Sequence, residues 1–284
     1  MQISFINGQF VSKHDAKVSI EDRGFNFADG VYEVINFKNS VLLNFSKHLK
    51  RLKRSLLETK IKSPFINMNS LHLIIKNLIH LNSVNEGFIY IQITRGTSQR
   101  NHLFPKNVLA NIVISLYSHK SFDILKKGVK VRLSSDLRWK RCDIKTISLL
   151  PNVLGKQLAH ELGVYELWLI NNKKEITEGT TSNAFIILDN EKILTHPKNN
   201  FILGGVTRDS VIEVARQNKL ELEEKAFTLS QAFSAKEAFL TSTTVGVLPV
   251  LGIDDKIISK GKVGSVTQKL MKLYDGYLSK QLNE

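Results

Sequence analysis

One lysine and one glutamate in the second half of the chain have side chains that could do chemistry together. Lys145 ends residues 138–145 (RWKRCDIK), and Glu178 lies in residues 177–183 (TEGTTSN). A lysine amine can form a Schiff base with an aldehyde, and a carboxylate can hold a proton on an aromatic ring nitrogen. Taken alone, either residue would more commonly be a solvated surface charge, since the chain has 40 lysines and arginines.

The size and composition of the chain indicate an ordinary globular protein. Its 284 residues are 42% hydrophobic, and no apolar run approaches the roughly 18 residues of a membrane helix. Residues 1–10 lack the basic start and apolar stretch of a signal peptide, so we expect a cytoplasmic protein with no membrane partner. The single cysteine, Cys142, can form neither an internal disulfide nor a metal site by itself, and no metal is expected.

The chain is strongly basic, which raises the possibility of a nucleic-acid partner. Lysine and arginine number 40 against 26 acidic residues, a formal net charge of +14. The basic residues are dispersed along stretches such as 47–60 and 120–130, and no strip of aromatic and basic residues accompanies them. We therefore interpret the charge as a solvated surface that attracts anionic substrates, and expect no nucleic-acid partner.

Hydrophobic periodicity predicts a mixed α+β protein. Apolar residues recur at helical spacing in residues 45–56 and 71–81 and alternate with polar ones in residues 89–94, as in a half-buried strand. Other strands are expected at residues 31–37, 112–117 and 129–133. The least patterned stretch, residues 118–127, predicts a boundary. We expect a small N-terminal α/β subdomain (1–118), a linker (119–128) and a larger C-terminal subdomain (129–284) that contains the lysine.

The pattern after Lys145 is different. A helix is expected to run to about Glu161, with Gly163 as its stop signal. Later strands are expected at residues 166–170, 184–188, 222–227 and 238–242, and later helices at residues 206–217 and 263–278. Glu178 is then expected in a polar turn between two strands.

Seven short segments, taken in order, carry a family resemblance. Residues 21–34 (EDRGFNFADGVYEV) resemble the opening motif of the class IV, or fold type IV, aminotransferases. The others are residues 48–52 (HLKRL), 94–96 (TRG), 143–145 (DIK), 177–179 (TEG), 205–208 (GVTR) and 241–244 (TSTT). The resemblance covers roughly residues 5–270. It implies two subdomains of mixed sheets with packed helices, and pyridoxal 5'-phosphate bound at the subdomain interface.

The resemblance assigns roles that suit the residue types. Lys145 would hold the coenzyme as a Schiff base and carry out the 1,3-proton transfer of transamination, while Glu178 would face the ring nitrogen. Arg51, which lies off the apolar stripe of its helix, would bind the phosphate, since an arginine fork suits that group. The amides of a helix starting at Val206 and Thr207 would add to this site. Thr243 would supply a further hydroxyl.

Recognition of the substrate carboxylate is expected in the loop after residues 94–96. Arg100 and His102 lie two residues apart there, a spacing that resembles the carboxylate trap of the D-amino-acid aminotransferases. In that family the trap acts with the tyrosine that matches Tyr32, and it reaches into the site of the other subunit. The resemblance thus implies a homodimer that passes the amino group of D-amino acids, of the D-alanine type, to a 2-oxo acid such as 2-oxoglutarate. A basic loop exposed to solvent is the alternative interpretation of these two residues.

Three alternative functions stay open. A branched-chain L-amino-acid aminotransferase shares the coenzyme residues but resembles this chain less at residues 100–102. Aminodeoxychorismate lyase shares the fold and would need no acceptor oxo acid. A non-catalytic basic protein would bind polyanions with strong salt dependence and hold no coenzyme. One departure from the D-amino-acid relatives is Val245-Gly246, where they can carry a polar and an acidic residue, and it indicates a more apolar side-chain preference.

Overall fold

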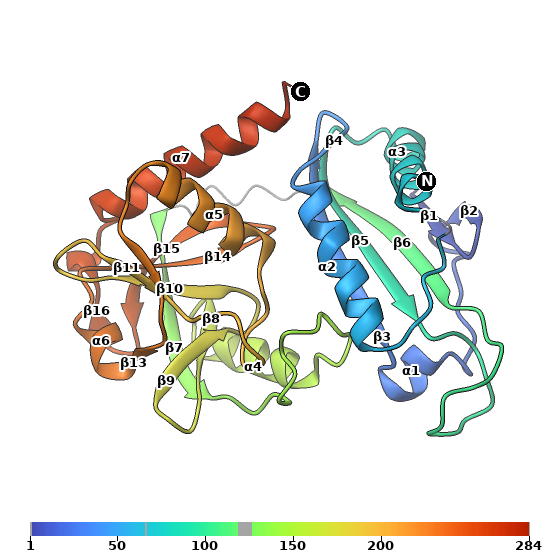
Figure 1. The fold of residues 1–284 in the computed structure, drawn as a ribbon, viewed down its shortest axis with the longest axis horizontal. Coiled ribbons are helices and arrows are strands. Elements are labelled where there is room, and N and C mark those ends of the chain that lie inside the picture. Colours follow the sequence, from blue (N-terminus) through green and yellow to red (C-terminus); the bar gives the residue numbers. More distant parts are fainter. Residues whose placement is uncertain (1, 66, 119–126, 284) are drawn as a thin grey trace. The chain divides into compact units, whose positions relative to one another are not determined.

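The chain folds into two compact units in a computed structural model that describes residues 2–65, 67–118 and 127–283. Unit 1 consists of Met1–Lys120 and Ile144–Ser148, and unit 2 of Ser121–Asp143 and Leu149–Glu284 (Figure 1). Most of the expected linker, residues 119–126, lies outside the described residues. Among the described residues, no helix is long and apolar enough to cross a membrane.

Unit 1 is built on a six-stranded sheet with the order β2-β1-β6-β5-β3-β4, in which all neighbours are antiparallel. The strands are β1 (Ile3–Ile6), β2 (Gln9–Ser12), β3 (Gly30–Lys38), β4 (Val41–Leu42), β5 (Glu86–Thr94) and β6 (Asn111–Ser118). Alternate residues of β3 and β5 are buried, as the period of two in the sequence predicted. The central strands of this sheet are therefore confirmed.

Two longer helices cover the buried face of this sheet. They are α2 (Phe45–Glu58) and α3 (Met68–Asn82), while the short α1 (Arg23–Phe27) precedes β3. Leu52, Leu56 and Leu71 point into the core that they share with the sheet. The helical spacing in both segments is confirmed. Leu81, which the periodicity placed on the buried stripe of α3, is 46% exposed, because Ile75 and Ile79 supply the packed face instead.

The lysine segment belongs to unit 1, although the strands before and after it belong to unit 2. Residues Ile144–Ser148 lie beside the start of β3, where the Tyr32 amide donates to the carbonyl oxygen of Lys145 (3.0 Å). The Ile147 amide donates in turn to the carbonyl of Gly30 (3.1 Å). Sequence order alone assigned Lys145 to the C-terminal subdomain. The structure differs because these bridge contacts attach five residues to the N-terminal sheet.

Unit 2 is built on a ten-stranded mixed sheet, ordered β12-β11-β10-β14-β15-β7-β8-β9-β13 with β16 paired to β15. Its strands are β7 (Val129–Ser135), β8 (Glu166–Ile170), β9 (Glu175–Gly179), β10 (Asn183–Ile187), β11 (Ile193–Thr195), β12 (Leu222–Glu224), β13 (Phe227–Thr228), β14 (Glu237–Ser242), β15 (Gly246–Ile253) and β16 (Lys256–Ile257). β7 runs parallel to β8 and β15. The expected α+β class is confirmed, since each unit consists of a sheet with helices packed on it.

Helices pack on both faces of the sheet of unit 2. Its helices are α4 (Leu150–Glu161), α5 (Val206–Gln217), α6 (Leu229–Phe233), the 3-10 turn η2 (Ser259–Gly261) and α7 (Ser265–Gln281). Figure 1 shows α5 and α7 side by side, and Val211 and Leu270 from these helices share one core with Phe185 and Phe239 of the sheet. A second core around Trp168 fills another part of the unit. The expected helix at residues 206–217 is confirmed to the residue.

Four strands of unit 2 were not expected from the sequence: β9, β11, β15 and β16. β9 covers the stretch interpreted as a polar turn, and its residues 176–179 are all buried. It forms because β8 pairs with it on one side and β13 on the other, which satisfies its backbone groups whatever its side-chain pattern. The polar-turn expectation for Glu178 is therefore wrong: the side chain leaves a buried strand.

Candidate active site

Lys145 is held at the edge of unit 1 with its amine above an aromatic ring. Its Nζ lies 4.0 Å from the centroid of the Tyr32 ring. The backbone on both sides of the side chain is fixed, because the Lys145 amide donates to Ser55 Oγ of α2 (3.3 Å) and its carbonyl accepts from Tyr32 (3.0 Å). The structure thus brings together the lysine and the tyrosine that the sequence singled out. Lys145 is half-buried, which suits a residue that must meet a substrate.

Arg51 lies on α2 with its guanidinium against a buried carboxylate. Its Nε donates to Glu33 Oε1 (2.9 Å) and its Nη2 to Glu33 Oε2 (3.1 Å), a two-bond fork. His48, one turn earlier on α2, places its Nδ1 2.7 Å from the same Glu33 Oε2. Glu33 itself has no solvent exposure. The expected phosphate ligand is therefore oriented by a carboxylate to which sequence analysis gave no role.

The charge balance around Glu33 favours its ionised form. Burial by itself would raise the pKa of this carboxyl, but Arg51, His48 and Lys145 lower it, so the pKa lies below its ordinary value. Burial lowers the pKa of His48, although Glu33 opposes the shift. The cluster thus pairs a carboxylate with a neutral imidazole and a guanidinium at neutral pH. Alternation in β3 gave a signal for it, because Glu33 has the same parity as Val31 and Ile35.

Arg100 and His102 lie in the loop between β5 and β6, and both are exposed. The Arg100 guanidinium lies 5.0 Å from the centroid of the Phe27 ring, and the His102 ring lies 5.2 Å from it. The Arg23 guanidinium supports the loop by donating to the Asn101 carbonyl. The two side chains are therefore close together on one aromatic ring of α1. Within unit 1, no contact joins them to Tyr32 among the described interactions.

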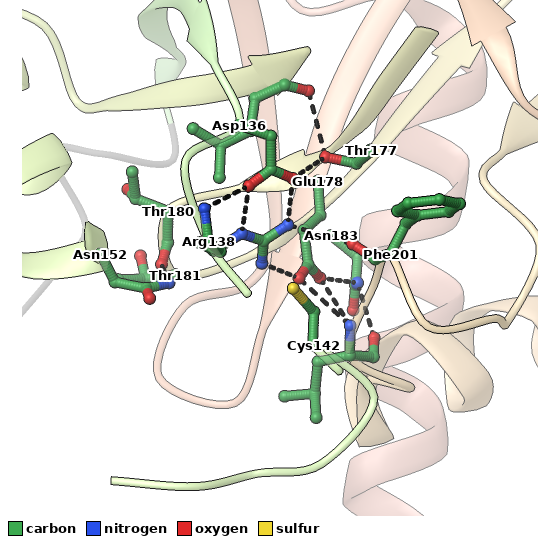
Figure 2. A network of polar contacts seen from close by, with 12 residues as sticks. Asp136, Arg138, Cys142, Asn152, Thr177, Glu178, Thr180, Thr181, Asn183 and Phe201 are labelled. Atoms are coloured by element: carbon green, nitrogen blue, oxygen red, sulfur yellow. Dashed lines mark hydrogen bonds and ion pairs between the residues drawn. The ribbon is translucent and has the colours of Figure 1, made fainter. Parts of the chain in front are cut away.

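Glu178 in unit 2 is surrounded by hydrogen-bond donors (Figure 2). The Nη1 of Arg138 donates to its Oε1, and Asn183 Nδ2 donates to its Oε2 (2.8 Å). The backbone amide of Leu203 lies 3.1 Å from each carboxylate oxygen. Only 4% of the residue is exposed. The donors come from three segments distant in sequence, which fixes the direction of the carboxylate.

The pKa of Glu178 is raised to about 7 even though an arginine touches it. Burial is the largest cause, and Arg138 opposes it. Part of the positive charge of Arg138 is used elsewhere, since its Nε and Nη2 donate to Asp136 at 2.9 and 2.7 Å. Asp136 also raises the pKa of Glu178 directly. Near neutral pH this carboxyl can therefore gain or lose a proton at little cost.

The start of α5 offers backbone donors to an anion. Gly205 is the residue before the helix and gives no side-chain cap to its first turn. No larger residue would fit, because a Cβ there would lie 2.1 Å from Asn183 Oδ1. Val206 and Thr207 follow, both nearly buried. Thr243 lies in the turn after β14 and is half-buried, so all three residues stand in unit 2 with Glu178.

Each unit by itself offers groups that suit one part of an anionic aromatic molecule with an aldehyde and a protonated ring nitrogen. Lys145 and Arg51 supply an amine and a guanidinium from unit 1. Unit 2 supplies a buried carboxylate at Glu178 and uncapped helix amides at Val206 and Thr207. Sequence analysis missed several residues that hold these groups. They are Glu33, His48, Ser55, Asp136, Asn183 and the Leu203 amide.

A family model described as amino-transferase class IV matches residues 30–253. The chain belongs to the class IV aminotransferases. The resemblance drawn from the seven motifs is confirmed, and with it the activity class and the coenzyme, pyridoxal 5'-phosphate. Among curated proteins, this aminotransferase is 36% identical to the D-alanine aminotransferase of Staphylococcus aureus strain N315 over 280 residues, 98% of each chain. It is 37% identical to that of Bacillus licheniformis over 271 residues, 95% of this chain and 94% of the relative.

Solved structures share the fold of the aminotransferase at lower identity. The Escherichia coli branched-chain amino acid aminotransferase has a TM-score of 0.91 at 21% identity, and the match covers 98% of this chain and 94% of the other. The branched-chain aminotransferase of the archaeon Thermoproteus uzoniensis, solved with norvaline, has a TM-score of 0.89 at 22% identity, and the match covers 99% and 95%. These likenesses confirm the fold type. At such identity they carry no information on the substrate.

Proposed function

We propose that this aminotransferase transfers the amino group of D-amino acids, of the D-alanine type, to a 2-oxo acid such as 2-oxoglutarate. The observation that carries the proposal is the identity of 36% with a D-alanine aminotransferase over 98% of both chains. The paired guanidinium and imidazole of Arg100 and His102, held on one ring, support it. A carboxylate bound by two such donors leaves the rest of the amino acid free to meet the lysine.

The proposed roles follow the geometry of each unit. When bound, the pyridoxal ring accepts the electron pair that is released as the substrate loses its Cα proton. Lys145 Nζ would hold the coenzyme covalently at rest. Once the amino group of the substrate had displaced it, the free amine would take the Cα proton and return it in the 1,3-proton transfer. Glu178 holds the proton on the ring nitrogen. The phosphate is bound by Arg51, by the hydroxyl groups of Thr207 and Thr243 and by the backbone amide of Val206. The ring therefore keeps its place while its covalent partner changes.

Substrate handedness is proposed to depend on where the carboxylate is bound. If Arg100 and His102 hold it together with Tyr32, the Cα proton of the D enantiomer is the one presented to Lys145 Nζ. We further propose that this loop acts in the site of a second copy of the chain, which makes the enzyme a homodimer. The exposure of both loop side chains fits a role that is completed by another chain. Cytoplasmic location is part of the same proposal.

The direct test of the activity supplies the coenzyme-loaded protein with one acceptor, 2-oxoglutarate, and a panel of donors. D-alanine, L-alanine, D-leucine and L-leucine are compared by the oxo acid formed. The proposal predicts turnover of the D enantiomers. Turnover of L-leucine alone would favour a branched-chain L-aminotransferase, and turnover of L-substrates only would reject the proposal.

A complementation experiment tests the shared site. Lys145→Ala and the double variant Arg100→Ala/His102→Ala are purified separately and are each expected to be inactive or nearly so. After joint unfolding and refolding, mixed dimers contain one site with both defects and one site with neither. Recovered activity is the expected result. A mixture as inactive as its components, although mixed dimers form, would contradict the contribution of the loop across subunits.

A further inference from the structure

The Arg138 guanidinium donates hydrogen bonds to two carboxylates, and Asp136 accepts more of them than Glu178 does. Of its five N–H groups, the Nε–H and one on Nη2 bind Asp136, a second on Nη2 binds the Phe201 carbonyl (3.1 Å), and Nη1 binds Glu178. Figure 2 shows the guanidinium between the two acids. The side chains of all three charged residues are at most 10% exposed. Solvent therefore screens these interactions little.

Asp136 is itself held firmly in this place. Its amide donates to the Ile170 carbonyl (2.9 Å) at the end of β8, and Thr177 Oγ1 donates to its Oδ2 (2.9 Å). Its Oδ1 accepts from the Arg138 amide (3.1 Å) as well as from Nε. Together with the guanidinium, these donors hold the pKa of Asp136 below its ordinary value, against the effect of burial. Asp136 is therefore a fixed negative charge.

The cluster as a whole carries an excess negative charge. Asp136 and an ionised Glu178 count two negative charges against the one positive charge of Arg138. The remaining partners of Glu178, Asn183 Nδ2 and the Leu203 amide, are neutral. Cys142, a titratable side chain close to this cluster, has a pKa raised to about 12 and so stays a neutral thiol. A proton on Glu178, or a cation bound to it, restores neutrality.

We infer that Asp136 is a positioning residue for Glu178. The hydrogen bonds that Asp136 accepts from one edge of the Arg138 guanidinium fix which N–H of Arg138 reaches Glu178. They also limit the positive charge that acts on Glu178. This rests on the proposed role of Glu178 as partner of the coenzyme ring nitrogen. A carboxylate fully neutralised by its own arginine would be a poor acceptor for the ring proton. With the arginine shared, the excess negative charge is available to that proton.

The test is a titration of Glu178 in the full-length, coenzyme-free protein. Carboxyl carbons are labelled with glutamate carrying ¹³C at Cδ, and the Glu178 signal is assigned by its loss in Glu178→Gln. In Asp136→Asn the whole charge of Arg138 becomes available, so the pKa of Glu178 is expected to fall by about one unit or more. Asp136→Glu keeps the charge and is expected to restore a pKa near that of the wild type. An unchanged pKa in Asp136→Asn overturns the inference.

A matched control comes from the same segment. Asp143 accepts a similar fork, but from Arg141 two residues away, with Nε at 3.0 Å and Nη2 at 3.2 Å. Asp143→Asn leaves the bonds between Asp136 and Arg138 in place, so it is expected to leave the pKa of Glu178 unchanged. If it lowers that pKa as much as Asp136→Asn does, the effect is a general one of removing negative charge and the inference is overturned.

A second variant covers the case in which Asp136→Asn fails to fold. Arg138→Met removes the cation and leaves Asp136 in place, so the pKa of Glu178 is expected to rise above the wild-type value. A pKa that stays constant or falls overturns the inference.

Coenzyme binding separates this inference from the proposed function. The dissociation constant of pyridoxal phosphate is expected to increase about tenfold in Asp136→Asn, the equivalent of one pKa unit. If Glu178→Gln binds the coenzyme as tightly as the wild type, the proposed role of Glu178 is rejected, while the titration still decides whether Asp136 positions it.

Discussion

Glu33 in unit 1 and Glu178 in unit 2 are both buried carboxylates beside an arginine, and yet their pKa values move in opposite directions. Burial raises the pKa of each. Around Glu33, two cations and an imidazole outweigh burial, and the pKa ends below its ordinary value. Around Glu178, the single arginine is shared with Asp136, and the pKa ends at about 7. The number of cations per carboxylate, not the burial, decides the charge state.

This difference matches what each unit is proposed to do. Glu33 must keep Arg51 in one orientation, which a permanently ionised carboxylate does well. Glu178 must share a proton with a bound ring, which calls for a carboxyl whose two charge states are close in free energy. The same residue type thus supports an anchor in one unit and a proton partner in the other. Variants and titrations can separate the two roles, because they are expected to affect the reaction, the stability, the coenzyme affinity and the dependence of stability on pH.

The largest effect is expected at the reacting amine of unit 1. Lys145→Ala should lower the turnover rate by about a thousandfold or more, because both the covalent attachment and the proton transfer are lost. It should also abolish reduction of the coenzyme onto the protein by borohydride. Lys140→Ala, an exposed lysine five residues earlier, is the control and should keep its activity. Equal activity of the two variants would reject the role of Lys145.

Stability should respond differently to loss of the two carboxylates. Glu33→Gln removes the charged partner of Arg51, whose side chain is 10% exposed, and should lower the free energy of unfolding by about 3–5 kcal/mol. Glu178→Gln should lower it by about 1 kcal/mol, since Arg138 keeps Asp136 and the carboxyl is partly protonated at pH 7. Denaturant unfolding of the coenzyme-free proteins measures both. Equal losses would contradict the contrast between the two sites.

Coenzyme affinity should depend more on the phosphate ligand of unit 1 than on that of unit 2. Arg51→Gln removes a charged donor and should weaken binding of pyridoxal phosphate by about 2–3 kcal/mol, while Thr207→Val removes one neutral donor and should weaken it by about 1 kcal/mol. Equilibrium titration followed by coenzyme fluorescence gives both values. The reverse order would assign the phosphate to the start of α5.

The last contrast is a slope in stability with pH. Glu178 titrates near 4.5 in the unfolded chain and near 7 in the folded one, so between these values the folded state holds the extra proton. Its contribution therefore falls as pH rises from 4.5 to 7, by at most about 1.4 kcal/mol per pH unit. Glu33 has a lowered pKa, so its contribution is present above 4.5 and is lost only as pH falls further. His48 has a lowered pKa, so it adds a slope of opposite sign below pH 6.5 in all of these proteins. Unfolding curves from pH 4.5 to 7.5 should therefore lose the falling contribution of Glu178 in Glu178→Gln and keep it in Glu33→Gln.

The elements predicted best from the sequence are those that are stabilised by their own pattern of apolar residues. The stripe of α2 and the boundaries of α5 follow from apolar spacing and a glycine before the first turn. β9 was missed because glutamate, threonine and glycine dominate it, and its place depends on β8 and β13 beside it.

The same reason limits what the sequence says of the site. Motifs located Lys145, but no spacing encodes the pairing of its backbone with Tyr32 across more than a hundred residues. Asp136 reaches Thr177 across 41 residues of chain, and no local pattern marks it. Glu33 was missed as well, although its place among the alternating apolar residues of β3 gave a signal for it.

A single-turnover measurement tests the proposed function most directly. The coenzyme-loaded protein is mixed with D-alanine or L-alanine in the absence of any oxo acid, and the coenzyme absorbance and the pyruvate released are followed. D-alanine is predicted to convert the coenzyme to its amine form with one pyruvate per site, while L-alanine leaves the spectrum unchanged. Conversion by L-alanine alone, or no conversion by either, would contradict the assignment of this chain as a D-amino-acid aminotransferase.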